Sequence, residues 1–236
     1  MSLPNDFAWG VATSSYQIEG SVGEGRGECI WHRFSHTPGK TLNGEHGDVA
    51  CDHLHRYRDD VALMRDLGIK HYRFSTSWPR VLPNGTGAVN PRGMDFYDAL
   101  IDTLREAGIT PYLTLYHWDL PQALQDRGGW ENPDSVQWFT DYARLMVERF
   151  GDRVPYWMTH NEPWCTSFLS NQFGIHAPGK RDLSAALRVA HSLLRSHGMA
   201  ARAIRDHNHS LKVGIAINMN GITPASDDLL DLQAAV

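Results

Sequence analysis

The stretch Tyr156–Trp164, which reads YWMTHNEPW, decides how the rest of the chain is interpreted. It begins as a short apolar run that favours a β-strand, and Pro163 ends that run because proline cannot donate to a sheet. Asn161 and Glu162 come directly before the stop, between two tryptophans. Aromatic walls remove water from a carboxyl group and raise its pKa toward the range in which it releases a proton at neutral pH. We therefore expect Glu162 to be a functional acid rather than the cap of a turn.

Strand-like and helix-like segments alternate along the whole chain. Apolar, β-prone runs predict strands over residues 7–13, 69–75, 109–116, 156–160 and 212–218. Apolar residues at helical spacing predict helices over residues 52–67, 91–107, 133–150 and 183–206. The pairs Asn90-Pro91 and Asn132-Pro133 are typical of helix starts, with the asparagine as cap and the proline as first helical residue. Alternation without hairpin signals indicates parallel strands joined by helical crossovers.

The connections on the two sides of the predicted sheet differ in character. Turns from helix to strand are short, whereas the connections from strand to helix are long and rich in polar and aromatic residues, including Gln17, Trp78, His117, Trp118 and Glu162. In a barrel of parallel strands these long connections gather at the carboxyl face, where active sites are built. We predict an α/β fold of the (β/α)8 TIM barrel type, with residues 1–236 as one domain that holds about five strands and four helices.

The composition of the chain limits which partners it can bind and in which cellular compartment it is expected. The net charge is −5 and no basic run is present, which argues against nucleic acid and anionic membrane as partners. No apolar stretch approaches the roughly 18 residues of a membrane span. The first residues show neither a basic nor an apolar region of a secretion signal. Cys29, Cys51 and Cys165 are odd in number and far apart, which favours free thiols in a reducing compartment, so we expect a cytoplasmic protein.

Five ordered motifs resemble one known family. They are Phe7–Gly20 (FAWGVATSSYQIEG), Tyr72–Arg80 (YRFSTSWPR), Leu115–Pro121 (LYHWDLP), Thr159–Pro163 (THNEP) and His176–Gly179 (HAPG). Their sequence and order are similar to those of glycoside hydrolase family 1, the β-glucosidases and their relatives. The resemblance runs from Phe7 to Met219.

The resemblance implies a (β/α)8 barrel that cleaves β-linked sugars, such as β-glucosides and oligosaccharides, with retention of configuration. Glu162 matches the general acid/base, and Asn161 matches the amide that contacts the sugar 2-hydroxyl. The remaining matches are Gln17 and His117 for the 3- and 4-hydroxyls, Trp118 as their neighbour, and Arg73 beside the nucleophile. The residue types suit these tasks, because amides and imidazoles both donate and accept, and indoles offer a flat apolar platform for a sugar ring. No cofactor and no metal is implied.

The sequence departs from the family pattern in its carboxylates. The family nucleophile is a glutamate on the seventh strand, in a Glu-Asn-Gly motif, and neither that motif nor any glutamate follows Glu162 in the 236 residues. Glu131 stands at a predicted helix start and reads as a cap, while Glu19 and Glu24 lie in the first loop. We therefore expect this chain to supply the acid/base half of a barrel, and a second chain or fragment to carry the remaining strands and the nucleophile.

Two other functions are compatible with the same residues. A metal-dependent hydrolase would use His117, Asp119, His160 and Glu162 as ligands, and the spacing of His117 and Asp119 around a strand end is possible for a metal site. Against this function, the first predicted strand has no His-x-His pair, and His53 and His55 lie on a predicted helix at a spacing that does not converge. A non-catalytic sugar-binding half-barrel would keep the sugar contacts without a nucleophile.

Overall fold

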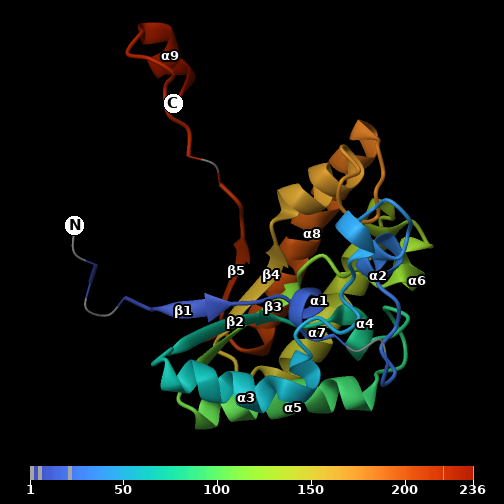
Figure 1. Ribbon diagram of the computed structural model, residues 1–236, viewed down its shortest axis with the longest axis vertical. Coiled ribbons are helices and arrows are strands. Elements are labelled where there is room, and N and C mark those ends of the chain that lie inside the picture. The colour runs from blue at the N-terminus through green and yellow to red at the C-terminus, as the bar shows by residue number, and fades with distance from the viewer. Residues whose placement is uncertain (1–2, 5–6, 21–22, 220, 236) are drawn as a thin grey trace.

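The computed structural model describes residues 3–4, 7–20, 23–219 and 221–235. Its centre is a sheet of five parallel strands in chain order, namely β1 (Gly10–Ala12), β2 (His71–Ser75), β3 (Thr110–Tyr116), β4 (Tyr156–Asn161) and β5 (Lys212–Ala216). Figure 1 shows them side by side, from β1 in blue to β5 in red. The five predicted strands are confirmed, with β1 shorter than the run that predicts it.

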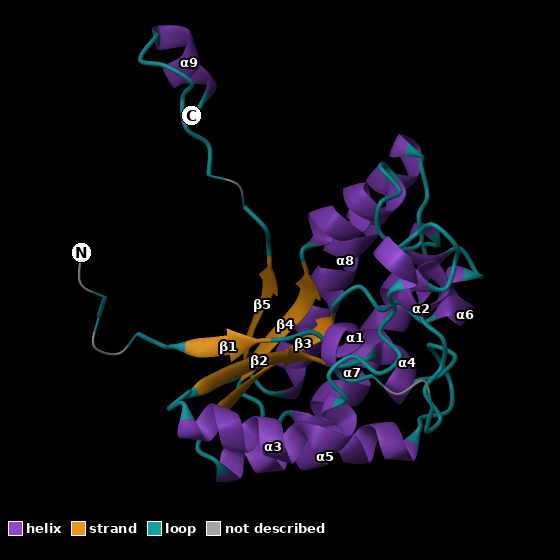
Figure 2. Ribbon diagram, viewed as in Figure 1, coloured by secondary structure: helices purple, strands orange, loops and turns teal. Residues whose placement is uncertain are grey.

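A long helix lies between each strand and the next. These helices are α3 (His53–Asp66), α5 (Pro91–Glu106), α7 (Ser135–Phe150) and α8 (Leu183–His207). Figure 2 shows them on the same side of the sheet. Their apolar stripes pack on strand residues such as Phe74, Leu113 and Trp157, which are almost fully buried. The chain therefore forms part of a (β/α) barrel, as the alternating pattern predicts.

Short helices that the sequence did not reveal fill the connections. They are α1 (Ser15–Ile18), α2 (Ile30–Ser35), η1 (Leu42–Gly44), α4 (Trp78–Val81), α6 (Gln122–Gln125), η2 (Gly129–Glu131) and η3 (Cys165–Leu169), with α9 (Leu229–Ala234) after β5. None exceeds six residues, so none carries enough turns to show a period of 3.6.

One of the two predicted helix starts is wrong. Pro91 is the first residue of α5, as predicted, and Gly108 follows that helix with φ of +71°, a conformation that glycine adopts without strain. Helix α7, however, begins at Ser135 rather than at Pro133. Asn132 instead closes a turn, because its Oδ1 accepts from the Asp134 N–H at 2.9 Å and its Nδ2 donates to the Arg127 carbonyl at 2.8 Å. Local side-chain bonds of this kind compete with helix formation.

The sheet is open at both ends. Strand β1 pairs only with β2 among the described residues, and β5 only with β4. All three residues of β1 are exposed, and the face of β2–β4 opposite the helices carries the half-buried rings of Tyr112 and Tyr156, stacked at 4.2 Å. Residues 217–219 and 221–228, between β5 and α9, lie away from the sheet (Figure 1). None of the helices in the described ranges is long and apolar enough to cross a membrane.

Candidate active site

The carboxyl ends of the first four strands bring the predicted site residues to one edge of the sheet. Arg73 lies in β2, and His117 and Trp118 directly follow β3. Asn161 is the last residue of β4, and Glu162 comes next. Because neighbouring parallel strands end at the same edge, segments more than 80 residues apart in sequence meet here.

The amide of Asn161 is at the centre of this edge. Its Oδ1 accepts from Arg73 Nη2 at 2.6 Å, and its Nδ2 lies 3.1 Å from His117 Nε2. The carboxamide oxygen is engaged by Arg73, so the nitrogen must donate to His117, whose Nε2 therefore accepts. Asn161 is 4% exposed, so these two partners fix the plane of its amide.

His117 is neutral in this environment. Burial, and to a smaller extent the charge of Arg73, lowers the pKa of His117 to about 3. With Nε2 accepting, the ring hydrogen is on Nδ1. The hydrogen on His117 Nδ1 is therefore buried without an acceptor among the described residues.

Trp118 supports the same strand end through its indole. Its Nε1–H donates to the backbone carbonyl of Asn161 at 2.9 Å. Its backbone has φ of +77°, which is unusual for a residue with a side chain. The indole hydrogen is therefore used for structure.

Glu162 also has a left-handed backbone, with φ of +48°. Its N–H donates to the carbonyl of Ala216 in β5 at 2.7 Å, which ties the acid to the neighbouring strand. Its Oε2 accepts from the thiol of Cys165 at 3.3 Å. Burial first, and then the bond to Glu162 and its charge, raises the pKa of Cys165 to about 12, so the thiol stays protonated as a donor.

The two tryptophans of the opening stretch lie elsewhere than expected. Trp157 is 1% exposed in the core and donates to the Val154 carbonyl. Trp164 is 46% exposed and stacks on Phe168. The ionisable groups near Glu162 are Arg73, Cys165 and His176, and its negative charge acts to raise the pKa of each.

A pocket of about 120 Å³ adjoins this cluster. Gln17, His117 and Trp118 line it together with Ser14, Tyr16 and Trp31. The indoles of Trp31 and Trp118 are stacked with ring centres 6.4 Å apart, and His176 packs on both. Trp31 was missed because nothing in its local sequence marks it, whereas Tyr16 and His176 lie within recognised motifs. A larger hollow of about 520 Å³ lies at the opposite, amino ends of the strands, near Gly108 and Asp152, and contains none of the predicted site residues.

The four residues considered as metal ligands do not converge. Asp119 is fully buried and accepts from Ser15 Oγ at 2.9 Å, while His160 is fully buried and contacts Ser196 Oγ at 2.9 Å. In the described part of the chain they belong to no group of ligand atoms close enough to share an ion.

Other carboxylates are held in ion pairs. Glu19 is buried, 2.9 Å from Arg80 Nε, and accepts from the Tyr97 hydroxyl at 2.7 Å. Glu131 is not a helix cap, because it pairs with Lys180 at 2.5 Å and with Arg188 at 2.7 Å. Glu24 pairs with the exposed His55.

Comparisons with known proteins identify the family of the chain. A family model described as "Glycosyl hydrolase family 1" matches residues 1–236. Beta-glucosidase A of Acetivibrio thermocellus is 53% identical over the whole chain, and Beta-glucosidase A of Thermotoga maritima is 53% identical over 98% of it. The chain spans about half the length of these relatives, 53% and 52% respectively.

Solved structures show the same correspondence. The Thermotoga maritima beta-glucosidase in complex with glucoimidazole superposes with a TM-score of 0.96 at 52% identity, over 99% of this chain and 53% of that one. Its complex with deoxynojirimycin gives a TM-score of 0.94, again over 99% of this chain and 53% of that one. The family model matches every residue of a chain that folds as part of a barrel, so the chain belongs to glycosyl hydrolase family 1.

Proposed function

We propose that the protein is part of a retaining β-glycosidase of the β-glucosidase type, in which Glu162 is the general acid/base. The observation that carries this proposal is the position of Glu162 directly after Asn161, whose amide is held by Arg73 and His117. The names of the relatives support the substrate class, terminal β-linked glycosides.

The contacts of Glu162 and Asn161 suit the two halves of such a reaction. Glu162 would protonate the departing oxygen and later accept a proton from the attacking water. One hydrogen of Asn161 Nδ2 is directed to His117, which leaves the second for the sugar 2-hydroxyl. That contact strengthens as the transition state develops.

The pocket beside the acid is the proposed site for the sugar ring. The imidazole of His117 and the exposed amide of Gln17 would bind neighbouring hydroxyls, and the indole of Trp118 would carry the ring. The side chains of His117 and Gln17 both donate and accept hydrogen bonds, and so do the closely spaced hydroxyls of a sugar.

The second carboxylate is proposed to lie in sequence outside the 236 residues. Retention requires two carboxyl groups roughly 5–5.5 Å apart. The glutamates of the early loops are held by Arg80, Lys180, Arg188 and His55. Arg73, which borders both Asn161 and the charge of Glu162, would neighbour the incoming nucleophile. Relatives about twice as long leave room for it on the same polypeptide, and a second chain is the alternative.

A pair of substrates tests the role of Glu162 in the complete enzyme. Glu162→Gln should slow formation of the glycosyl-enzyme from an alkyl glycoside by about 10²–10⁴, and much less from an aryl glycoside whose leaving group needs little protonation. Glu148→Gln, which removes an exposed carboxylate from α7, should leave both rates unchanged. An equal loss on the two substrates would exclude Glu162 as the acid.

A complementation test separates catalysis from binding alone. The 236-residue chain by itself should not turn over an aryl β-glucoside, and co-expression with a polypeptide that bears the later strands should restore hydrolysis. Full turnover by the isolated chain would contradict the proposal that the second catalytic carboxylate lies outside these 236 residues. Sugar binding without restored turnover would favour the non-catalytic half-barrel.

We also propose a cytoplasmic location. Cys29, Cys51 and Cys165 are all free thiols in the structure, which supports a reducing compartment.

A further inference from the structure

Three ionisable side chains converge outside the candidate active site, where α2 meets the loop that follows it. His32 lies on α2 and His36 directly follows that helix, four residues later and so on the same face. Asp48 approaches from the segment after η1. We propose that His32, His36 and Asp48 form a binding site for one divalent transition-metal ion of the zinc class, which fastens the first loop of the barrel.

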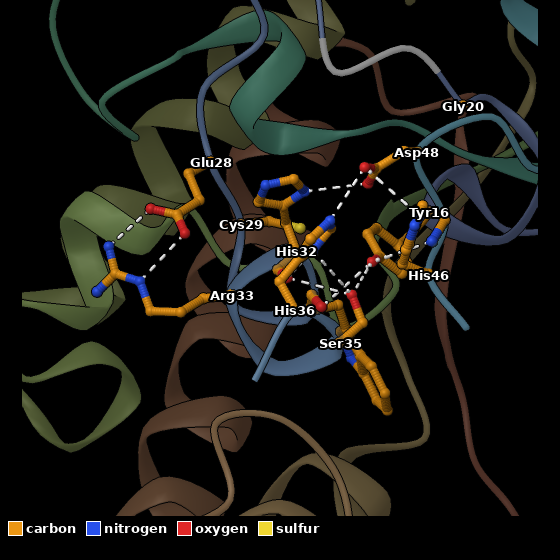
Figure 3. Close-up of polar contacts among 12 residues, drawn as sticks. Tyr16, Gly20, Glu28, Cys29, His32, Arg33, Ser35, His36, His46 and Asp48 are labelled. Carbon is orange, nitrogen blue, oxygen red and sulfur yellow. Dashed lines mark hydrogen bonds and ion pairs between the residues drawn. The ribbon is translucent and has the colours of Figure 1, made fainter. Parts of the chain in front are cut away.

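The distances between the three side chains fit such an ion. One ligand atom from each residue lies within 4.8 Å of the other two. His36 Nε2 is 3.0 Å from Asp48 Oδ2, and His32 Nδ1 is 3.3 Å from Asp48 Oδ1. In a tetrahedral zinc site with bonds of about 2.0–2.1 Å, neighbouring ligand atoms are about 3.3 Å apart. Figure 3 shows the imidazoles and the carboxylate facing one another.

The hydrogen bonds of His36 leave a lone pair directed at the carboxylate. His36 Nδ1 lies 2.8 Å from the backbone carbonyl of His32, and a carbonyl only accepts, so Nδ1 carries the ring hydrogen. In the neutral ring, Nε2 then presents its lone pair to Asp48 Oδ2 at 3.0 Å. Two acceptors at that distance need either a proton on Nε2 or a metal ion between them.

A proton on His36 would satisfy only one of these contacts. Asp48 Oδ1 is buried and accepts no hydrogen bond among the described residues, although His32 Nδ1 lies 3.3 Å away. A single ion would bind that oxygen, His32 and His36 together. Two imidazole nitrogens and a carboxylate oxygen are ligands that favour zinc-class ions over Mg²⁺ or Ca²⁺.

His46 stands beside the same carboxylate. Its Nδ1 is 3.4 Å from Asp48 Oδ2, and its ring stacks on His36 with centres 4.7 Å apart. The fourth coordination position would belong to His46 or to a water molecule, and the proposal rests on the other three residues.

The site is connected to the wall of the candidate sugar pocket. Trp31 precedes His32, and the Tyr16 hydroxyl donates to the Trp31 carbonyl at 3.2 Å. The N–H of Gly47, next to Asp48, donates to the same hydroxyl at 3.4 Å. An ion held by His32, His36 and Asp48 would therefore fix α2 against the 46–48 segment and hold Trp31 and Tyr16 in place. Metal binding itself does not depend on the proposed glycosidase activity.

The experiment measures Zn²⁺ binding to the metal-stripped protein by titration calorimetry, with Mg²⁺ as the comparison ion. We expect one equivalent of Zn²⁺ to bind and Mg²⁺ not to. His36→Gln and Asp48→Asn should each weaken Zn²⁺ binding at least about tenfold, the loss caused by removing even an outer partner of a ligand. His55→Gln is the matched control, because it removes an exposed imidazole that pairs with Asp52 and Glu24 and should leave binding unchanged.

Two further measurements use the unaltered protein, so they do not depend on the folding of a variant. Its urea midpoint should rise with Zn²⁺, and Co²⁺ should give the visible spectrum of a low-coordinate site with nitrogen ligands, which Zn²⁺ then abolishes. Failure of Zn²⁺ to saturate the protein, affinity unchanged in both His36→Gln and Asp48→Asn, or an all-oxygen Co²⁺ spectrum would each overturn the proposal.

Discussion

Arg73 Nη2 donates to Asn161 Oδ1 at 2.6 Å, across the strand that separates them in the sheet. On that middle strand Thr114 Oγ1 accepts from Arg73 Nε at 2.9 Å. One guanidinium therefore joins β2, β3 and β4 and sets the orientation of the amide. A lysine could not do this, because its single ammonium lacks the planar fork that reaches both partners.

Replacing Asn161 by alanine should lower kcat and kcat/KM of the complete enzyme by similar factors. The contact with the sugar 2-hydroxyl is expected to strengthen in the transition state rather than in ground-state binding. Steady-state kinetics on an aryl β-glucoside measure this, with the exposed Asn208→Ala as control. A rise in KM alone would make Asn161 a binding residue only.

The three thiols should react with a disulfide reagent at very different rates. Cys51 is exposed, whereas burial raises the pKa of Cys29 to about 11 and that of Cys165 to about 12. Because the thiolate is the reactive form, one fast thiol per native chain and three per unfolded chain are expected. In Glu162→Gln, the negative charge that raises the pKa of Cys165 is removed and the acceptor of its thiol is weaker. Cys165 should therefore react faster in this variant. Equal rates with and without Glu162 would mean that the Cys165–Glu162 contact is not formed.

Removing the carboxylate of Glu19 should destabilise the fold strongly. Arg80 and Glu19 are 1% and 4% exposed, so Glu19→Gln leaves a buried guanidinium without its counter-charge. The expected loss in the free energy of unfolding is about 3–5 kcal/mol. Glu28→Gln, which breaks the exposed pair with Arg33, should cost less than about 1 kcal/mol. Urea unfolding measures the free energy of unfolding of the two variants. Equal losses would mean that the Glu19–Arg80 pair is not a buried ion pair.

Acid should destabilise the protein through His160. Burial, with a smaller part from His197, lowers the pKa of His160 to about 3, against about 6.5 in the unfolded chain. The unfolded state binds the proton first, so the stabilisation is complete above the unfolded pKa and is lost as the pH falls toward 3. Between about pH 7 and 5 this one group should cost about 2 kcal/mol.

Urea unfolding at these two pH values checks that slope. His160→Gln should lose less stability on acidification than the unaltered protein, and the exposed His209→Gln should not differ from it. Asp119 acts in the opposite direction, because burial raises its pKa to about 6 and so favours folding at low pH. An unchanged slope in His160→Gln would mean that His160 is not held neutral.

Much of the fold could be predicted because its signals are periodic. Helices of fourteen or more residues, such as α5, repeat their apolar stripe several times, and Pro91 and Gly108 mark the two ends. The start of α7 could not be predicted, because an asparagine can either cap a helix or close a turn. The bonds of Asn132 with Arg127 and Asp134 decide between the two, and they are known only from the structure.

The residues of the candidate site could be predicted from the sequence, but the hydrogen bonds between them could not. Glu162, Asn161, His117 and Arg73 are recognisable as motif residues, yet the tautomer of His117 follows only from the bond between Arg73 and Asn161. Trp31 and the cluster around Asp48 depend on how the first loop folds back, which no local pattern specifies. The spacing of His32 and His36, four residues apart, was the one signal available for that cluster.

The left-handed backbone of Glu162 implies a trade-off between stability and function. A side chain in that conformation costs roughly 1–2 kcal/mol, a penalty that glycine does not incur. Glu162→Gly should therefore unfold at a higher urea concentration than Glu162→Ala. Glu162 stands at this strand end despite the strain, so selecting variants for stability alone would favour glycine there and would remove the proposed acid.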